Sequence, residues 1–79
     1  MAELRSIFID YEMAQKLTPF FMEIRGSAPM VEARRAAGRL LDALGNIRDV
    51  DYGETGGYQL RLQEMDYQFL KDTIEALGL

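Results

Sequence analysis

Alternating apolar and polar positions near the start of the chain predict a β-strand. Residues 4–12 are rich in β-branched and aromatic side chains, and Ile7, Ile9 and Tyr11 would lie on one face of an extended backbone. A strand with one buried face has this period of two.

A second strand is predicted near residues 19–25, after a connection through residues 13–18. Apolar positions in the second strand alternate in the same way, at Phe20, Met22 and Ile24. The alternative is a helix over residues 4–18, because apolar residues also recur there at helical spacing. Pro19 weighs against a helix that continues past it, since proline lacks a backbone donor and its ring collides with the preceding turn.

A helix is predicted from about residue 28 to residue 44. Ser27 is a suitable N-cap, Pro29 would stand in the tolerated first turn, and Gly45 would end the helix. Apolar residues recur at three- and four-residue intervals and define its buried face: Met30, Ala33, Ala37, Leu40, Leu41 and Leu44.

The remaining pattern predicts a hairpin and a last helix. Residues 48–52 and 58–62 alternate as strands, and the glycine-rich segment 53–57 would turn the chain between them. Asp66 could cap a final helix that Gly78 would end. Its apolar stripe consists of Tyr67, Leu70, Ile74 and Leu77.

The predicted order is therefore ββαββα within a single domain, residues 1–79. Two helices with one apolar face each would cover one side of a four-stranded, mainly antiparallel sheet, giving a two-layer α+β sandwich. This order resembles a ferredoxin-like half-wind, a layout that serves many unrelated functions.

The composition argues against catalysis. The chain has no histidine and no cysteine, so the commonest general base, metal ligand and thiol nucleophile are absent. We expect no enzymatic activity, no cofactor and no metal. Thirteen acidic residues face nine basic ones, a net charge of −4. This balance disfavours direct nucleic-acid binding, which requires a basic surface.

No apolar run is long enough for a secretory signal or a transmembrane helix. We therefore expect no membrane association and a cytoplasmic location. Since a domain of this size buries a modest core, a homodimer or another small homo-oligomer is also expected.

Two sets of residues are candidates for binding a protein partner. The first is an acidic surface that could meet a basic partner: Asp49, Asp51, Glu54, Asp72 and Glu75. The second is an apolar patch on the open face of the predicted sheet, at Phe8 and Phe21, because exposed aromatic residues on a soluble domain commonly mark an interface.

A third set, Arg34, Arg35 and Arg39, could bind an anionic ligand such as a nucleotide. The alternative is that Glu32 and Asp42 neutralise these arginines along the helix, because both stand three residues from an arginine.

The leading hypothesis is a non-catalytic binding protein that occupies the surface of a larger protein, for example a nucleic-acid-binding one. In size, charge and lack of catalytic residues the chain is similar to small phage or bacterial inhibitors such as anti-CRISPR proteins and nuclease immunity proteins. The alternatives are a structural or regulatory homo-oligomer and a small sensor or sponge for an anionic ligand.

Overall fold

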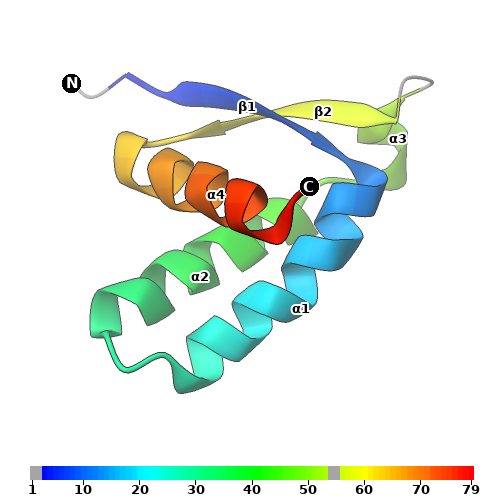
Figure 1. Ribbon diagram of the computed structural model, residues 1–79. Helices are drawn as coiled ribbons and strands as arrows, with labels where there is room; N and C mark the ends of the chain where they lie inside the picture. The colour runs from blue at the N-terminus through cyan, green and yellow to red at the C-terminus, as the bar shows by residue number, and fades with distance from the viewer. Residues whose placement is uncertain (1–2, 54–55) are drawn as a thin grey trace.

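Four helices and one two-stranded sheet make up residues 3–53 and 56–79, the part of the chain that this computed structural model describes. Only the backbone of Asp49 belongs to that part. The elements follow in the order β1 (Arg5–Asp10), α1 (Tyr11–Ser27), α2 (Val31–Gly45), α3 (Asp49–Tyr52), β2 (Gly57–Leu62) and α4 (Glu64–Leu77) (Figure 1).

The predicted four-stranded α+β sandwich, with its ferredoxin-like ββαββα order, is wrong. Within the described residues the sheet has two strands, β1 and β2, which pair antiparallel in a register from Arg5 opposite Leu62 to Asp10 opposite Gly57. Strands were expected near residues 4–12 and 58–62, and both are present. The helices lie on one side of this ribbon (Figure 1).

The strand predicted near residues 19–25 is instead the second half of α1. The helix begins directly after β1, where the Asp10 side chain accepts a hydrogen bond of 2.7 Å from the backbone N–H of Met13 and so caps the first turn. The alternative helix over residues 4–18 is also wrong at its start, since residues 5–10 pair with β2. The chain changes from strand to helix at the capping aspartate.

Pro19 lies inside α1 without ending it. A proline at this position deprives the Gln15 carbonyl of its helical donor, which costs about 3 kcal/mol in a helix interior. Gln15 and Pro19 are both on the exposed side of the helix, so water can reach that carbonyl. On the other side Leu17 and Phe21 are fully buried, and their burial offsets the cost.

The strand predicted at residues 48–52 is the short helix α3. The Asp51 carboxylate accepts a hydrogen bond of 2.8 Å from the backbone N–H of Arg48, which closes one helical turn. An alternation over five residues is too short to outweigh such a local side-chain-to-backbone bond. The chain then turns at Gly53, where φ is 64°.

The two predicted amphipathic helices are confirmed, with different starts. The first, expected over residues 28–44, is α2 and begins after Met30. Ser27 is not its cap but the last residue of α1, with its hydroxyl bonded to the Glu23 carbonyl. The last helix, α4, begins before Asp66 and ends at Gly78, which has the expected left-handed conformation.

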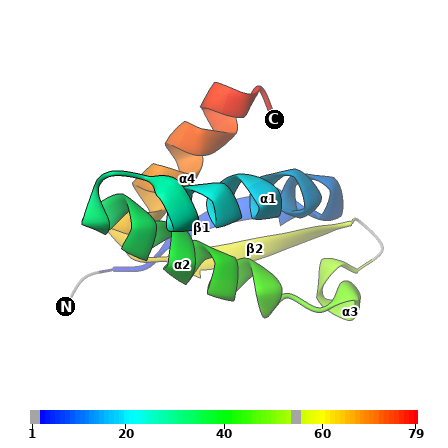
Figure 2. The same ribbon diagram turned by 90° about the horizontal axis from the view of Figure 1, so that it is seen from below.

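The core lies between the ribbon and the helices. α1 and α2 form an antiparallel pair, and α4 crosses between this pair and β1–β2 (Figures 1 and 2). At the attachment of α4 to β1, Arg5 forms an ion pair of 2.8 Å with Glu64 and lies over the Tyr67 ring. The largest fully buried side chains are Ile9, Leu17, Phe21, Leu40 and Leu70. No helix within the described residues is long and apolar enough to span a bilayer.

The ring of Phe8 covers Gly57 on the outer face of the ribbon. Phe8 pairs with Gln59, so Gly57 is its diagonal neighbour on β2. A Cβ atom added at Gly57 would overlap that ring. The glycine therefore provides the space for an aromatic side chain across the ladder.

We expect Gly57→Ala to lower the free energy of unfolding by about 0.2–1 kcal/mol, because the half-exposed Phe8 ring must swing away and lose its cross-strand contact. Gly26→Ala is the matched control: Gly26 lies in α1, nothing is within 4 Å of its added Cβ, and removing a helical glycine should stabilise by about 0.5–1 kcal/mol. Urea unfolding measures both. Equal effects of the two substitutions would contradict the role assigned to Phe8.

Candidate functional site

The predicted acidic residues do not form one surface. Asp72 and Glu75 are exposed on α4, whereas Asp51 is on α3 and bonds to Arg48. Figure 2 shows α3 and the C-terminal half of α4 on opposite sides of the molecule. Glu54 and the side chain of Asp49 lie outside the described residues. Only the α4 pair therefore remains as a local acidic feature.

The predicted aromatic patch is also divided. Phe21 is fully buried and makes edge-to-face contacts with Phe20 and Phe69 at centroid distances of 5.8 Å, so it belongs to the core. Phe8 is 48% exposed on the outer face of the ribbon, where its ring covers Gly57. The two residues share no surface because Phe21 is part of a helix and not of a strand.

The three arginines of α2 have different surroundings. Arg34 donates a hydrogen bond of 2.8 Å to the Ala28 carbonyl, and Arg39 is bound to Asp66. Arg35 is exposed, and no hydrogen bond or ion pair to it is found within the described part of the chain. A shared anion site would need all three guanidinium groups to be available, and only that of Arg35 is.

Arg39 and Asp66 join α2 to the first turn of α4. The Nε and Nη2 atoms of Arg39 donate to the two carboxylate oxygens at 2.8–3.2 Å, in a bidentate arrangement. The Asp66 side chain is only 12% exposed. Its hydrogen bond raises the pKa of Arg39 despite the opposing effect of burial, because the pair favours the charged guanidinium.

Beside this ion pair, a hollow of about 590 Å³ opens between α2 and α4. Its apolar lining includes Met30, Met65 and Phe69, with Arg35 and Arg39 on the α2 side. Met30 and Met65 are 65% and 73% exposed, unusually high for side chains of this type. Glu32 also lies on the α2 side, so the hollow exposes flexible apolar groups beside charges of both signs.

A second hollow, of about 600 Å³, lies between α1 and α4. Met65 and Phe69 line this one too, together with Phe20 from α1, so the two hollows lie next to each other. Figure 2 shows that the C-terminal half of α4 diverges from α1 and α2. We call the four apolar residues Phe20, Met30, Met65 and Phe69 the apolar strip.

The charges around the apolar strip differ from end to end. Arg35 stands beside it where α4 begins, and Asp72 lines it further along α4. Asp72 accepts a hydrogen bond of 3.1 Å from Gln68, and Glu75 follows one turn later. Within the described residues neither carboxylate has a basic partner. Glu32 lines the hollow beside Arg35, so positive and negative charges balance where α4 begins, and the strip has an acidic end at Asp72.

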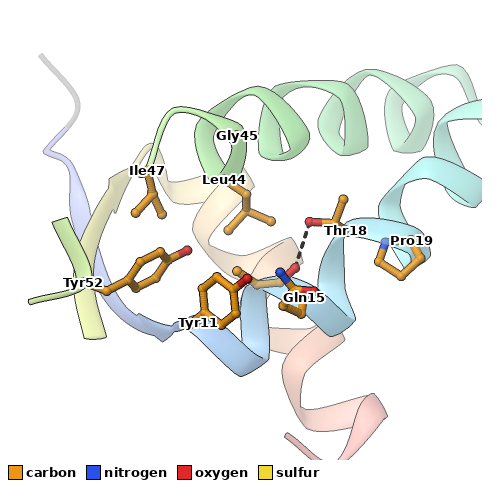
Figure 3. Close-up of a pocket in the computed structure, with 9 residues that line it drawn as sticks. Tyr11, Gln15, Thr18, Pro19, Leu44, Gly45, Ile47 and Tyr52 are labelled. Carbon is orange, nitrogen blue, oxygen red and sulfur yellow. Dashed lines mark hydrogen bonds between the residues drawn. The ribbon is translucent and has the colours of Figure 1, made fainter. Parts of the chain in front are cut away.

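A third hollow, of about 460 Å³, lies between α1, the end of α2 and α3 (Figure 3). The rings of Tyr11 and Tyr52 meet edge to face at its mouth, with centroids 5.8 Å apart. The Thr18 hydroxyl donates to the Ala14 carbonyl at 2.8 Å. The lining consists of aromatic, aliphatic, hydroxyl and amide groups and carries no charge, so it offers hydrogen bonds to a neutral molecule and no acid–base pair.

No protein-family model, curated protein or solved structure matches this chain. Its function therefore has to be inferred from the surface itself.

The exposure of two methionines was not predicted from the sequence. Met30 was assigned to the buried face of a helix, and Met65 was not assigned a role. Met65 stands five residues before the buried Leu70, a spacing that puts the two side chains on different sides of α4. This spacing was the signal that Met65 faces away from the core. Which helix lies beside that exposed face is decided by the tertiary structure alone.

We expect Arg39→Ala to lower the free energy of unfolding by about 1–3 kcal/mol, because the largely buried Asp66 carboxylate would lose its partner. Because the pKa of Arg39 is raised in the folded state, the guanidinium stays charged and its contribution persists from neutral to moderately alkaline pH. The deficit in urea unfolding should therefore be equal at neutral and moderately alkaline pH. Arg35→Ala is the control and should change stability by less than about 0.5 kcal/mol; equal losses for the two variants would contradict this assignment.

Proposed function

We propose that this chain is a non-catalytic protein-binding protein that acts by covering an apolar surface of another protein molecule. The observation that carries the proposal is the apolar strip. Four large apolar side chains, from α1, α4 and the residue before α2, line two adjacent hollows, and two of them are among the most exposed large apolar residues described. Such concentrations of exposed apolar surface on small domains mark interaction sites.

The residue types of the strip also support an interface. Methionine and phenylalanine are enriched at the centres of protein interfaces, and methionine can adjust its shape to a partner. Each such side chain contributes about 1.5–3 kcal/mol when it passes from full exposure to burial. Burial of the exposed Met30 and Met65 side chains by a partner would therefore favour association.

The charges beside the strip indicate the chemistry of the partner. Asp72 and Glu75 at its acidic end favour a partner that places arginine or lysine next to an apolar surface. A nucleic-acid-binding protein has such a basic surface, and the chain would inhibit it by occupying that surface. The strip supplies the affinity, and the carboxylates supply orientation and association rate.

Met65→Asp should weaken binding to a captured partner at least about 30-fold, because a charge would enter the centre of the interface. Met22→Asp is the matched control, since Met22 is exposed on α1 but lines none of the hollows. Tagged wild-type protein and both variants would be used for affinity capture from the native host, followed by quantitative mass spectrometry and titration of the purified pair.

The proposal requires that a protein bound by the wild type is lost with Met65→Asp and kept with Met22→Asp. Circular dichroism and urea unfolding check that both variants are folded, which their exposed positions favour. If the captured proteins bind Met65→Asp as tightly as the wild type, the strip is not the binding surface.

A further inference from the structure

We propose that the hollow between α1, the end of α2 and α3 binds a small, neutral aromatic molecule that carries an N–H donor (Figure 3). We call it the tyrosine hollow, after Tyr11 and Tyr52 in its lining. Its volume of about 460 Å³ is within the range of small-molecule sites. The tyrosine hollow shares no lining residue with the two hollows of the apolar strip, so this inference is independent of the proposed function.

Pro19 leaves a backbone acceptor in the wall of the tyrosine hollow. In an α-helix each carbonyl accepts from the N–H four residues later, and Pro19 has no N–H to give to the Gln15 carbonyl. Gln15 and Pro19 both line the hollow, so the carbonyl that points from one towards the other lies along its wall. Within the described residues, no side chain and no turn or loop N–H bonds to this carbonyl; the neighbouring Thr18 hydroxyl donates to Ala14 instead. A donor on a ligand can therefore supply the missing hydrogen bond.

The position of Pro19 also indicates a function. Proline is the least favourable residue in a helix interior. The burial of Leu17 and Phe21 on the other side of α1 does not need a proline, and Pro19 itself is exposed and adds little to the core. Sequences commonly break a local structural rule of this kind at functional sites. The residue that weakens α1 is thus the one that provides the hollow with an acceptor.

The end of α2 favours the same kind of ligand. Gly45, the last residue of α2, lines the tyrosine hollow. The last carbonyls of a helix form the negative end of its dipole, which attracts positive charge. The N–H group of a ligand carries a partial positive charge, so this end of α2 and the Gln15 carbonyl both favour a hydrogen-bond donor in the hollow.

The charges around the tyrosine hollow favour a ligand without a full charge. None of the lining residues is acidic or basic. The charged residues that adjoin the lining in the sequence are paired or act as a cap: Glu12 with Lys16, Arg48 with Asp51, and Asp10 at the start of α1. A charged ligand would lose hydration in the hollow without meeting an opposite charge in its lining.

The tyrosine rings favour an aromatic ligand. Tyr11 is 52% exposed, and its ring meets that of Tyr52 edge to face. Figure 3 shows the two rings near each other, with Gln15 and Pro19 further along α1. A flat ring can pack against the exposed Tyr11 ring in a stacked or edge-to-face arrangement. Gln15 is one turn, about 6 Å, further along the helix, so a molecule of one or two rings can contact Tyr11 and donate to the Gln15 carbonyl at once.

The test compares indole with N-methylindole, because the two molecules share their rings but only indole has an N–H donor. Each is titrated into isotope-labelled wild-type protein and followed by two-dimensional NMR. Indole should shift the backbone amides of Tyr11, Thr18, Gly45 and Tyr52 in a saturable way. It should bind at least about 5-fold more tightly than N-methylindole, the ratio that one hydrogen bond gives.

Pro19→Ala and Gln15→Leu separate the backbone acceptor from the side chains. Pro19→Ala gives α1 the N–H that the Gln15 carbonyl lacks, so it should raise the urea midpoint of unfolding and reduce the preference for indole to less than about 2-fold. A purely structural role of Pro19 would change stability without changing this preference. Gln15→Leu is the control: it removes the side-chain amide and keeps the backbone carbonyl, and the preference should remain.

Tyr11→Ala tests the aromatic contact. It should weaken the binding of both molecules at least about 10-fold, because both use the ring. Tyr58→Ala is the matched control, since Tyr58 lines none of the three hollows, and it should leave both Kd values unchanged. Circular dichroism checks that each variant is folded.

Several outcomes would overturn the site. These are no saturable shift at millimolar indole, shifts confined to the apolar strip, equal binding of indole and N-methylindole by the wild type, and an unchanged preference in Pro19→Ala. The proposed function is tested separately by host capture through Met65, so any of these results would leave it standing. Conversely, a strip that captures no protein would leave the tyrosine hollow unaffected.

Discussion

The pairing of β1 with β2 is the constraint on which the rest of this structure depends. It joins segments about fifty residues apart, with Arg5 opposite Leu62, and so encloses α1, α2 and α3 between the two strands. Closing so long a loop has a substantial entropic cost, and the burial of Ile9, Leu60 and Leu62 against the helices offsets it. Because α4 follows directly after β2, this pairing also decides where the last helix begins.

The sequence predicted those elements whose periodicity was long or clean. α2 and α4 each carry a full apolar stripe, and β2 alternates strictly. α1 was missed because apolar residues in its second half fit both periods: Leu17, Phe20, Phe21 and Ile24 follow helical spacing, while Phe20, Met22 and Ile24 alternate. Pro19 does not end α1, because water can reach the carbonyl that the proline leaves unpaired. This access lowers the cost of the missing hydrogen bond. Asp10, as an N-cap, was the local signal that could have located the boundary.

The candidate site was less accessible to sequence reasoning than the fold. The acidic residues of α4 could be placed on an exposed helix face from their spacing, but their separation from Asp51 depends on how α3 and α4 are oriented. The strip combines Phe20, Met30 and Met65 from three segments, and only tertiary packing brings these together. An apolar residue at helical spacing is assigned to the core by default, although a helix can have an apolar residue on either side.

The chain separates the residues that hold the fold from those that would bind. Ile9, Phe21 and Leu40 are fully buried, and substitutions there would lower the free energy of unfolding. Met30 and Met65 contribute little to the core because most of their surface is in water, so polar substitutions there should leave the fold intact. Phe69 connects the two groups, because one side of its ring contacts Phe21 and it also lines both hollows of the strip. Changes at the strip that spare Phe69 can therefore report on binding without the confounding effect of unfolding.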